Sequence, residues 1–259
     1  MNTTTSRSAP RSRLQRGVLT PQLIVEESLR LLDTAGTRGF SLPKLGRVLG
    51  ADPTAVYRYF PSKDDLLLSI ADRLIEEAIQ GFEPPECWVD TVADLARRIR
   101  AVYRAHPAAA SLSSFRTTRR PAEIRAVEWL LSAMREAGFE GHEAALAYRS
   151  IADFSLFLAG GEAKFLSLEP KQREADMGAW TRAYRSVDPD EFPNISALRD
   201  ALPKVTEDEI YEQALAFFLA GLRVQAPRGC PCPPGTHEPP RKGRQSGDQA
   251  LENEPTDCP

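Results

Sequence analysis

The chain has 259 residues, of which 42% are hydrophobic and 27% charged, so it can bury the core of one large or two small domains. Its longest apolar run is about nine residues, whereas a membrane-spanning helix needs roughly 18 or more. The net charge of −3 excludes a protein coated with positive charge, yet residues 1–63 hold ten basic and four acidic side chains. The chain is therefore basic at its start and acidic beyond it.

The two ends of the chain differ in composition from the middle. Residues 1–18 are rich in Ser, Thr and Arg without an apolar period, and we expect a flexible basic arm. Residues 226–259 contain eight prolines and four glycines, and we expect a disordered tail. The start of the chain lacks a signal-peptide pattern and the four cysteines are too few for a disulfide scaffold, so we expect a cytoplasmic protein.

Helical spacing of apolar residues dominates everything between these ends, which predicts an all-α fold. We expect one domain over residues 19–82 and a second over residues 83–225. Capping Thr, Ser and Asp side chains and first-turn prolines place the helices of the first domain. They cover residues 20–39, 41–49, 53–59 and 62–80. The second domain is expected to have helices at about 88–105, 107–114, 121–137, 142–166, 170–185 and 206–224, with an irregular loop at 186–205.

The second and third helices form a helix-turn-helix pattern, in which the second helix of the pair enters the DNA major groove. Gly50 suits a left-handed turn, and Asp52 suits the cap of the next helix. Val56 and Phe60 are four residues apart and can face the core. The same helix then presents its remaining side chains to DNA, namely Thr54, Tyr57, Arg58 and Tyr59.

These residues carry a family resemblance. LLDTAG (31–36), FSLPKLGRVLGADPTAVYRYF (40–60) and SKDDLL (62–67) resemble the DNA-binding domain of TetR-family transcriptional repressors. The resemblance implies DNA-facing positions at Ser41, Thr54, Tyr57, Arg58, Tyr59 and Lys63, with Lys63 on a phosphate. Pro43 departs from the family pattern, which often has a polar or basic residue there, and this shifts base readout toward the third helix.

The second domain resembles the regulatory domain of the tetracycline-repressor branch of that family. The resemblance is carried by RAHPAAASL (104–112), EAALAYRSIADF (143–154), FPNISALRDAL (192–202) and FFLAGL (217–222). It implies a small-molecule inducer pocket in each subunit and a homodimer formed by the last long helices. Aromatic residues and one acidic residue of this domain are our candidates for ligand binding: Tyr103, Phe115, Trp129, Tyr148, Asp153 and Phe157.

Small and apolar residues at helical spacing predict the dimer surface. Small residues let helix axes approach closely, and two helices from each subunit would form a four-helix bundle. The predicted helix at 142–166 contributes Ala145, Ala152, Ser155, Ala159 and Ala163. The predicted helix at 206–224 contributes Ala214, Phe217, Phe218, Gly221 and Leu222.

The sequence thus predicts a ligand-responsive repressor that binds a palindromic operator in double-stranded DNA. Two alternatives are a regulator controlled by a protein partner and, less well supported, an all-helical enzyme. We expect no enzymatic activity, because no nucleophile motif accompanies the scattered histidines. We also expect no metal or cofactor, because the spacing of Cys230, Cys232, His237 and Cys258 does not match a zinc site.

Overall fold

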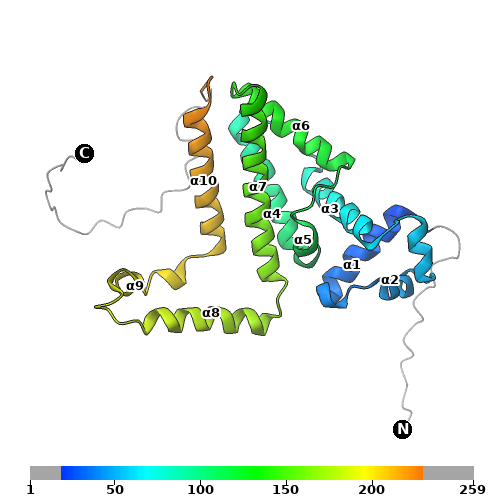
Figure 1. Cartoon of the computed structure of the whole chain (residues 1–259), viewed down its shortest axis with the longest axis horizontal. Helices are drawn as coiled ribbons and strands as arrows, with labels where there is room; N and C mark the ends of the chain where they lie inside the picture. Colours follow the sequence, from blue (N-terminus) through cyan, green and yellow to red (C-terminus); the bar gives the residue numbers. More distant parts are fainter. Residues whose placement is uncertain (1–18, 230–259) are drawn as a thin grey trace, which may run out of the picture.

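The computed structural model describes residues 19–229, and within this range every element of regular secondary structure is helical (Figure 1). The first domain consists of α1 (Pro21–Gly39), α2 (Leu42–Leu49), the 3₁₀ helix η1 (Pro53–Arg58) and α3 (Lys63–Ile79). The all-α fold and the four predicted N-terminal helices are confirmed. The predicted arm, residues 1–18, lies outside the described residues.

Local sequence determines where the helices of the first domain begin. The side chains of Thr20, Ser41 and Ser62 accept hydrogen bonds from the backbone amides of Leu23, Lys44 and Asp65, three residues further on in each case. Asp52 does the same for Thr54, two residues further on. Each cap satisfies an amide that would otherwise lack a partner at the helix start.

The second domain is built around α7 (Gly141–Leu166), which packs against α4 (Trp88–Ala105), α5 (Pro107–Ser113) and α6 (Pro121–Glu136). Helix α3 belongs to both domains, because it packs against α4, α5 and α6 as well as α1. One hydrophobic core includes Leu32 and Leu45 of the first domain together with Tyr103 and Ala159 of the second. The two domains therefore share buried apolar surface, which is the first requirement for a change in one to reach the other.

The C-terminal part is an extended arm followed by a long helix. Helices α8 (Pro170–Arg185) and α9 (Pro193–Leu198) contain no buried residue and project from the base of α7 in Figure 1. Helix α10 (Glu207–Gln225) then runs beside α7 and α4. The predicted irregular loop at 186–205 instead contains α9 and the short 3₁₀ helix η2 (Leu202–Lys204), each of which has a proline in its first turn.

The chain stays attached to the domain for four residues after α10. Ala226 is buried, the Arg228 amide donates to the Ala137 carbonyl at 3.0 Å, and the Trp88 indole donates to the Gly229 carbonyl at 3.3 Å. The rest of the predicted tail, residues 230–259, lies outside the described residues. Among the residues that are described, no helix is both long and apolar enough to cross a membrane.

Candidate DNA-binding and ligand sites

The turn between α2 and η1 depends on two glycines. Gly50 adopts φ 61°, the left-handed region that favours glycine, and ends α2. Gly46 is required for a different reason, because a Cβ atom there would lie 3.0 Å from the Ala51 carbonyl oxygen and 3.1 Å from Pro53 Cα. Sequence reasoning missed Gly46, although its small size inside an otherwise long-side-chained helix is the signal that could have identified it.

Helix η1 and the two residues after it present one face to the core and the other to solvent. Val56 and Phe60 are 1% and 5% exposed, whereas Tyr57 is 50% exposed and Arg58 also faces solvent. The Thr54 hydroxyl and amide both donate to the Asp52 carboxylate, at 2.6 and 2.8 Å, and these bonds lower the pKa of Asp52. The face predicted to meet DNA is thus exposed and held by a capped first turn.

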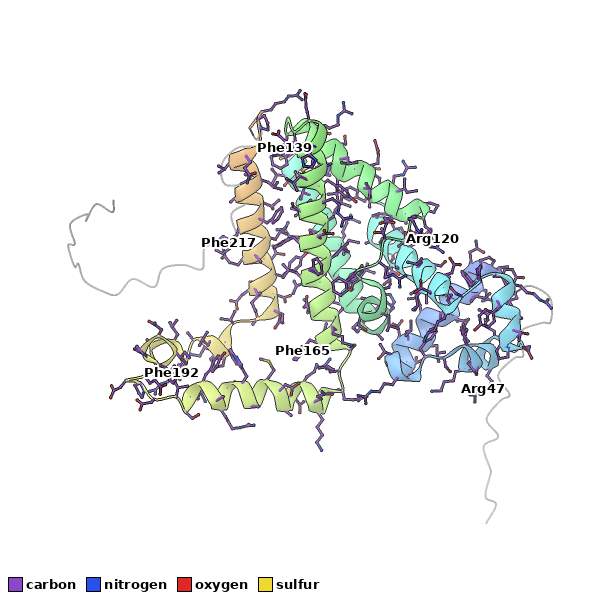
Figure 2. The ribbon with its side chains drawn as sticks, in the orientation of Figure 1. Arg47, Arg120, Phe139, Phe165, Phe192 and Phe217 are labelled. Atoms are coloured by element: carbon purple, nitrogen blue, oxygen red, sulfur yellow. The ribbon has the colours of Figure 1, made fainter. Side chains whose placement is uncertain are left out.

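Besides Thr54, three of the predicted DNA-facing residues have contacts within the protein. Ser41 caps α2, and the Tyr59 hydroxyl donates to the Leu19 carbonyl at 2.6 Å, which ties η1 to the start of α1. The Lys63 ammonium lies 5.6 Å from the centroid of the Phe40 ring. Sequence reasoning also omitted two exposed cations from this surface, Lys44 and Arg47 of α2, and Arg47 is labelled in Figure 2.

A cavity of about 100 Å³ lies among α3, α4, α6 and α7, next to the end of α5. Tyr103 and Tyr148, both predicted as ligand-binding, line it together. Helix α3 contributes Ala71, Ile75 and Ile79 to the wall. A ligand in this cavity would therefore touch the helix that begins at Lys63.

The other four ligand candidates do not line this cavity. Phe115 and Phe157 are 58% and 60% exposed and pack on each other, with ring centroids 5.0 Å apart. Trp129 packs on Phe82 at the same centroid distance. Asp153 pairs with Arg149 one turn earlier on the outer face of α7, at 3.0 Å, so it has a partner and does not point inward.

The predicted dimer stripe on α7 is largely used inside the chain. Ala159 and Ala163 are fully buried and Ser155 is 7% exposed, because α4 and α5 pack against this face. Ala152 lines the cavity. Of the five α7 residues predicted for the dimer, Ala145 is the one that remains exposed.

The loop between α5 and α6 connects the cavity to the start of α3. Arg116, which lines the cavity, makes two hydrogen bonds to Asp64 at 2.7 and 2.6 Å, and Arg120 donates to Asp65 at 2.8 Å. Figure 2 shows Arg120 at the start of α6, where this loop meets α3. Asp64 and Asp65 directly follow Lys63, so the loop holds the end of α3 that lies nearest the DNA-facing residues.

A third acidic residue of α3, Asp72, holds the start of α6. Its carboxylate accepts hydrogen bonds from the Thr118 hydroxyl at 2.9 Å and from the Glu123 amide at 3.0 Å. Glu123 in turn accepts from the Arg119 amide at 2.5 Å, and Arg119 adopts φ 59°, which is uncommon outside glycine. Movement at the cavity wall can therefore reach α3 through a short series of direct bonds.

Residues 19–229 contain no cluster of three or more His, Cys, Asp or Glu side chains arranged to hold a metal ion. The cysteine-containing segment that we judged unsuited to zinc lies outside the described residues. The geometry that the structure does offer is an exposed basic face and an apolar cavity, which is the arrangement of a binding protein.

Two family models together match most of the described chain. The model for "Bacterial regulatory proteins, tetR family" matches residues 24–70. The model for "Tetracyclin repressor-like, C-terminal domain" matches residues 82–226. The boundary between the two matches falls just after α3.

Individual proteins show the same similarity. An HTH-type transcriptional regulator of Saccharopolyspora erythraea is 33% identical over 122 residues, which are 47% of this chain and 52% of the relative. A class A tetracycline repressor protein from transposon 1721 of Escherichia coli is 26% identical over 206 residues, 79% of this chain and 90% of that protein. The chain spans about half the length of the HTH-type regulators that it matches.

A solved structure supports the fold. The crystal structure of the Streptomyces coelicolor protein ActR in complex with actinorhodin superposes with a TM-score of 0.70 at 23% identity. The superposition covers 82% of this chain and 100% of that one. The two-domain helical fold described above is therefore shared with a protein of low sequence identity.

Proposed function

The chain belongs to the tetR family of bacterial regulatory proteins, and from this premise we propose that it is a ligand-responsive transcriptional repressor. As a homodimer in the cytoplasm it binds a palindromic operator, and a small-molecule inducer in the cavity releases it. One observation carries the proposal: α3 begins at Lys63, beside the DNA-facing residues, and lines the cavity with Ala71 and Ile75. The cavity favours a small molecule over a protein partner, and the repressor name of the tetracycline relative supports repression.

In the proposed complex η1 enters the major groove. Tyr57 and Arg58 are the exposed side chains that can reach base edges, and Thr54 lies at the start of the same helix. Lys63 and the two exposed cations of α2 contact phosphates, which set the position of the protein but do not read sequence. Tyr59, whose hydroxyl is already bonded to Leu19, holds η1 in place for this contact.

The proposed dimer uses the outer face of α10. Ile210, Phe217 and Val224 are 45%, 71% and 88% exposed and recur every seven residues, so they form one apolar seam along the helix. Phe217 lies on the outer side of α10 in Figure 2. It also lines a surface groove between α10 and α7, to which Leu146 of α7 contributes. Phe218, in contrast, stacks on Phe154 within the chain at 4.7 Å. The seam has no covering element in residues 19–229, and a second copy would cover it.

We expect Phe217→Glu to convert the dimer to monomers and to weaken operator binding, because each half-site would then be bound alone. The matched control is Ile124→Glu, which places the same charge on a 60% exposed apolar position of α6. Sedimentation velocity at micromolar concentration measures the result. If Phe217→Glu sediments as a dimer, the interface lies on another surface.

The inducer acts by a population shift. It binds more tightly to a conformer in which the two DNA-binding domains no longer match the spacing of the half-sites. Because binding free energies are linked, the operator must lower the affinity for the inducer by the same factor by which the inducer lowers the affinity for the operator. We expect this factor to be about 5- to 150-fold, the range typical of such coupling.

The Asp72→Ala variant tests the route of this coupling. It removes the bonds from α3 to Thr118 and Glu123, and Asp72 itself does not line the cavity, so the coupling factor should fall. The bonds from Arg116 to Asp64 and from Arg120 to Asp65 remain and should carry the rest of the coupling. In the absence of DNA, the affinity of the variant for the inducer should stay within about threefold of the affinity of the parent protein, since no side chain that lines the cavity is replaced. Titrations of a screened inducer with and without operator give both quantities, and Arg149→Ala, which breaks an exposed pair on α7, is the control. Full coupling in Asp72→Ala would show that α3 is moved through other contacts.

A further inference from the structure

One wall of the cavity contains a buried hydroxyl group that has no hydrogen-bond partner. Ser114 is 2% exposed, and its hydroxyl has no hydrogen-bond partner. Tyr103, Tyr148 and Ser155 also line the cavity, and their hydroxyls bond to no other group in residues 19–229. The neighbouring Ser113 differs, because its hydroxyl donates to the Ala109 carbonyl at 2.8 Å. Leaving a buried polar group unbonded costs free energy, so the fully buried Ser114 hydroxyl in particular needs an explanation.

The position of Ser114 is determined by the helix opposite it. A Cβ atom on Gly160 of α7 would lie 2.5 Å from the Ser114 hydroxyl oxygen, so glycine at this position lets the loop pack against α7. Ser114 is thereby placed in the cavity wall beside Ser113 and Arg116.

The cavity offers no free charge. Two side chains that are charged at neutral pH line it, and they have opposite signs: Arg116 and Glu123. Arg116 is bound to both oxygens of Asp64, and Glu123 accepts from the Thr118 hydroxyl at 3.0 Å and from the Arg119 amide. Burial raises the pKa of Tyr103 and of Tyr148, so both phenols are protonated at neutral pH and can donate. A charged ligand would lose its hydration here without gaining a partner.

We propose that the ligand of this cavity is an uncharged, mainly apolar ring compound that carries at least two oxygen atoms, which bond to Ser114 and Tyr103. This inference rests on the proposed function in taking the cavity as the inducer site, and it names the chemical class of that inducer. The aliphatic walls, with Ile75, Val92 and Leu130 among them, favour the ring skeleton. The free volume of about 100 Å³ favours a small ring skeleton. A pure hydrocarbon would leave the buried Ser114 hydroxyl unsatisfied.

The test uses three matched two-ring probes and isothermal calorimetry on the full chain without DNA. The probes are a dihydroxynaphthalene, naphthalene and a naphthoate. We expect the dihydroxynaphthalene to bind at least about tenfold more tightly than either of the other two, since it alone supplies neutral polar partners. Ser114→Ala and Tyr103→Phe should each weaken its binding about 2- to 10-fold, and Ser113→Ala, in the same wall, should not.

A second readout separates ligand binding from a structural role. Ser114→Ala and Tyr103→Phe remove hydroxyls that have no partner in the unliganded protein, so the thermal midpoint should stay the same or rise. Four results would each overturn the proposal. In the calorimetry these are tightest binding of the naphthoate, equal binding of naphthalene and the dihydroxynaphthalene, and no binding of any probe. The fourth is a lowered thermal midpoint in both variants. Operator binding is measured separately. A repressor released by an anionic compound would retain the proposed function and refute this ligand class.

Discussion

Tyr57→Ala and Arg58→Ala should each reduce operator affinity by at least about 30-fold while the fold and the dimer remain intact. Losing one base-reading side chain costs about 1–3 kcal/mol, and a dimer loses it twice, so we expect about 2–6 kcal/mol. Tyr57 and Arg58 are exposed and have no hydrogen-bond partner in the part of the chain that the structure describes, so their removal should not destabilise the domain.

Gel shifts at fixed salt measure this loss, because phosphate contacts make every such affinity depend on salt. Arg125→Ala is the matched control, since it removes an exposed arginine from α6, far along the chain from η1. Sedimentation and circular dichroism report on the dimer and the fold. If both variants stay within about two-fold of the parent protein, η1 is not the recognition element.

Arg100→Ala should lower the free energy of unfolding by about 3–5 kcal/mol, the cost of removing one partner from a buried ion pair. The side chains of Arg100 and Glu162 are 9% and 7% exposed, and their atoms approach to 2.7 and 3.0 Å. Arg100 also reaches Asp208 at 2.8 Å and lies 4.4 Å from the centroid of the Tyr211 ring. The network joins α4 and α7 to α10. Its loss leaves the buried Glu162 carboxylate with only the longer 3.5 Å contact to Arg104, and it loosens the helix that carries the proposed dimer seam.

Arg97→Ala is the matched control for this prediction. Arg97 also lies on α4 and makes a two-pronged contact with a glutamate, Glu212 of α10, but that pair is 49% and 39% exposed. An exposed pair contributes about 0–1 kcal/mol. Urea unfolding of both variants should therefore separate them clearly, and equal losses would show that burial does not determine the effect.

The helices could be predicted from sequence because local signals determine them. The caps at Thr20, Ser41 and Ser62 and the break at Gly50 each act within a few residues, so the boundaries in the first domain agree with the structure. The division of η1 into a buried and an exposed face follows from Val56 and Phe60, which are four residues apart. The helix-turn-helix pattern indicates that the exposed face meets DNA, and the family resemblance adds Ser41 and Lys63 to that expectation.

The ligand residues were harder to predict because burial depends on contacts between distant segments. Phe115 and Phe157 are as apolar as core residues, yet they lie on an exposed face, which their hydrophobicity does not reveal. The unsatisfied hydroxyls have no sequence signal either, since Ser113 and Ser114 are neighbours and differ only in their surroundings. Arg100 and Glu162 pair across 62 residues, a separation at which spacing carries no information.

The central claim is that this chain reads a two-fold symmetric DNA sequence. Selection of bound fragments from a random double-stranded pool by the purified protein tests it most directly, because the enriched fragments give both the sequence and its symmetry. Our account predicts an inverted repeat whose half-sites lie on one face of the duplex, about 10 base pairs apart or a multiple of this. It also predicts that the Arg58→Ala protein loses the enrichment. No enrichment over the starting pool, or an enriched sequence without two-fold symmetry, would contradict it.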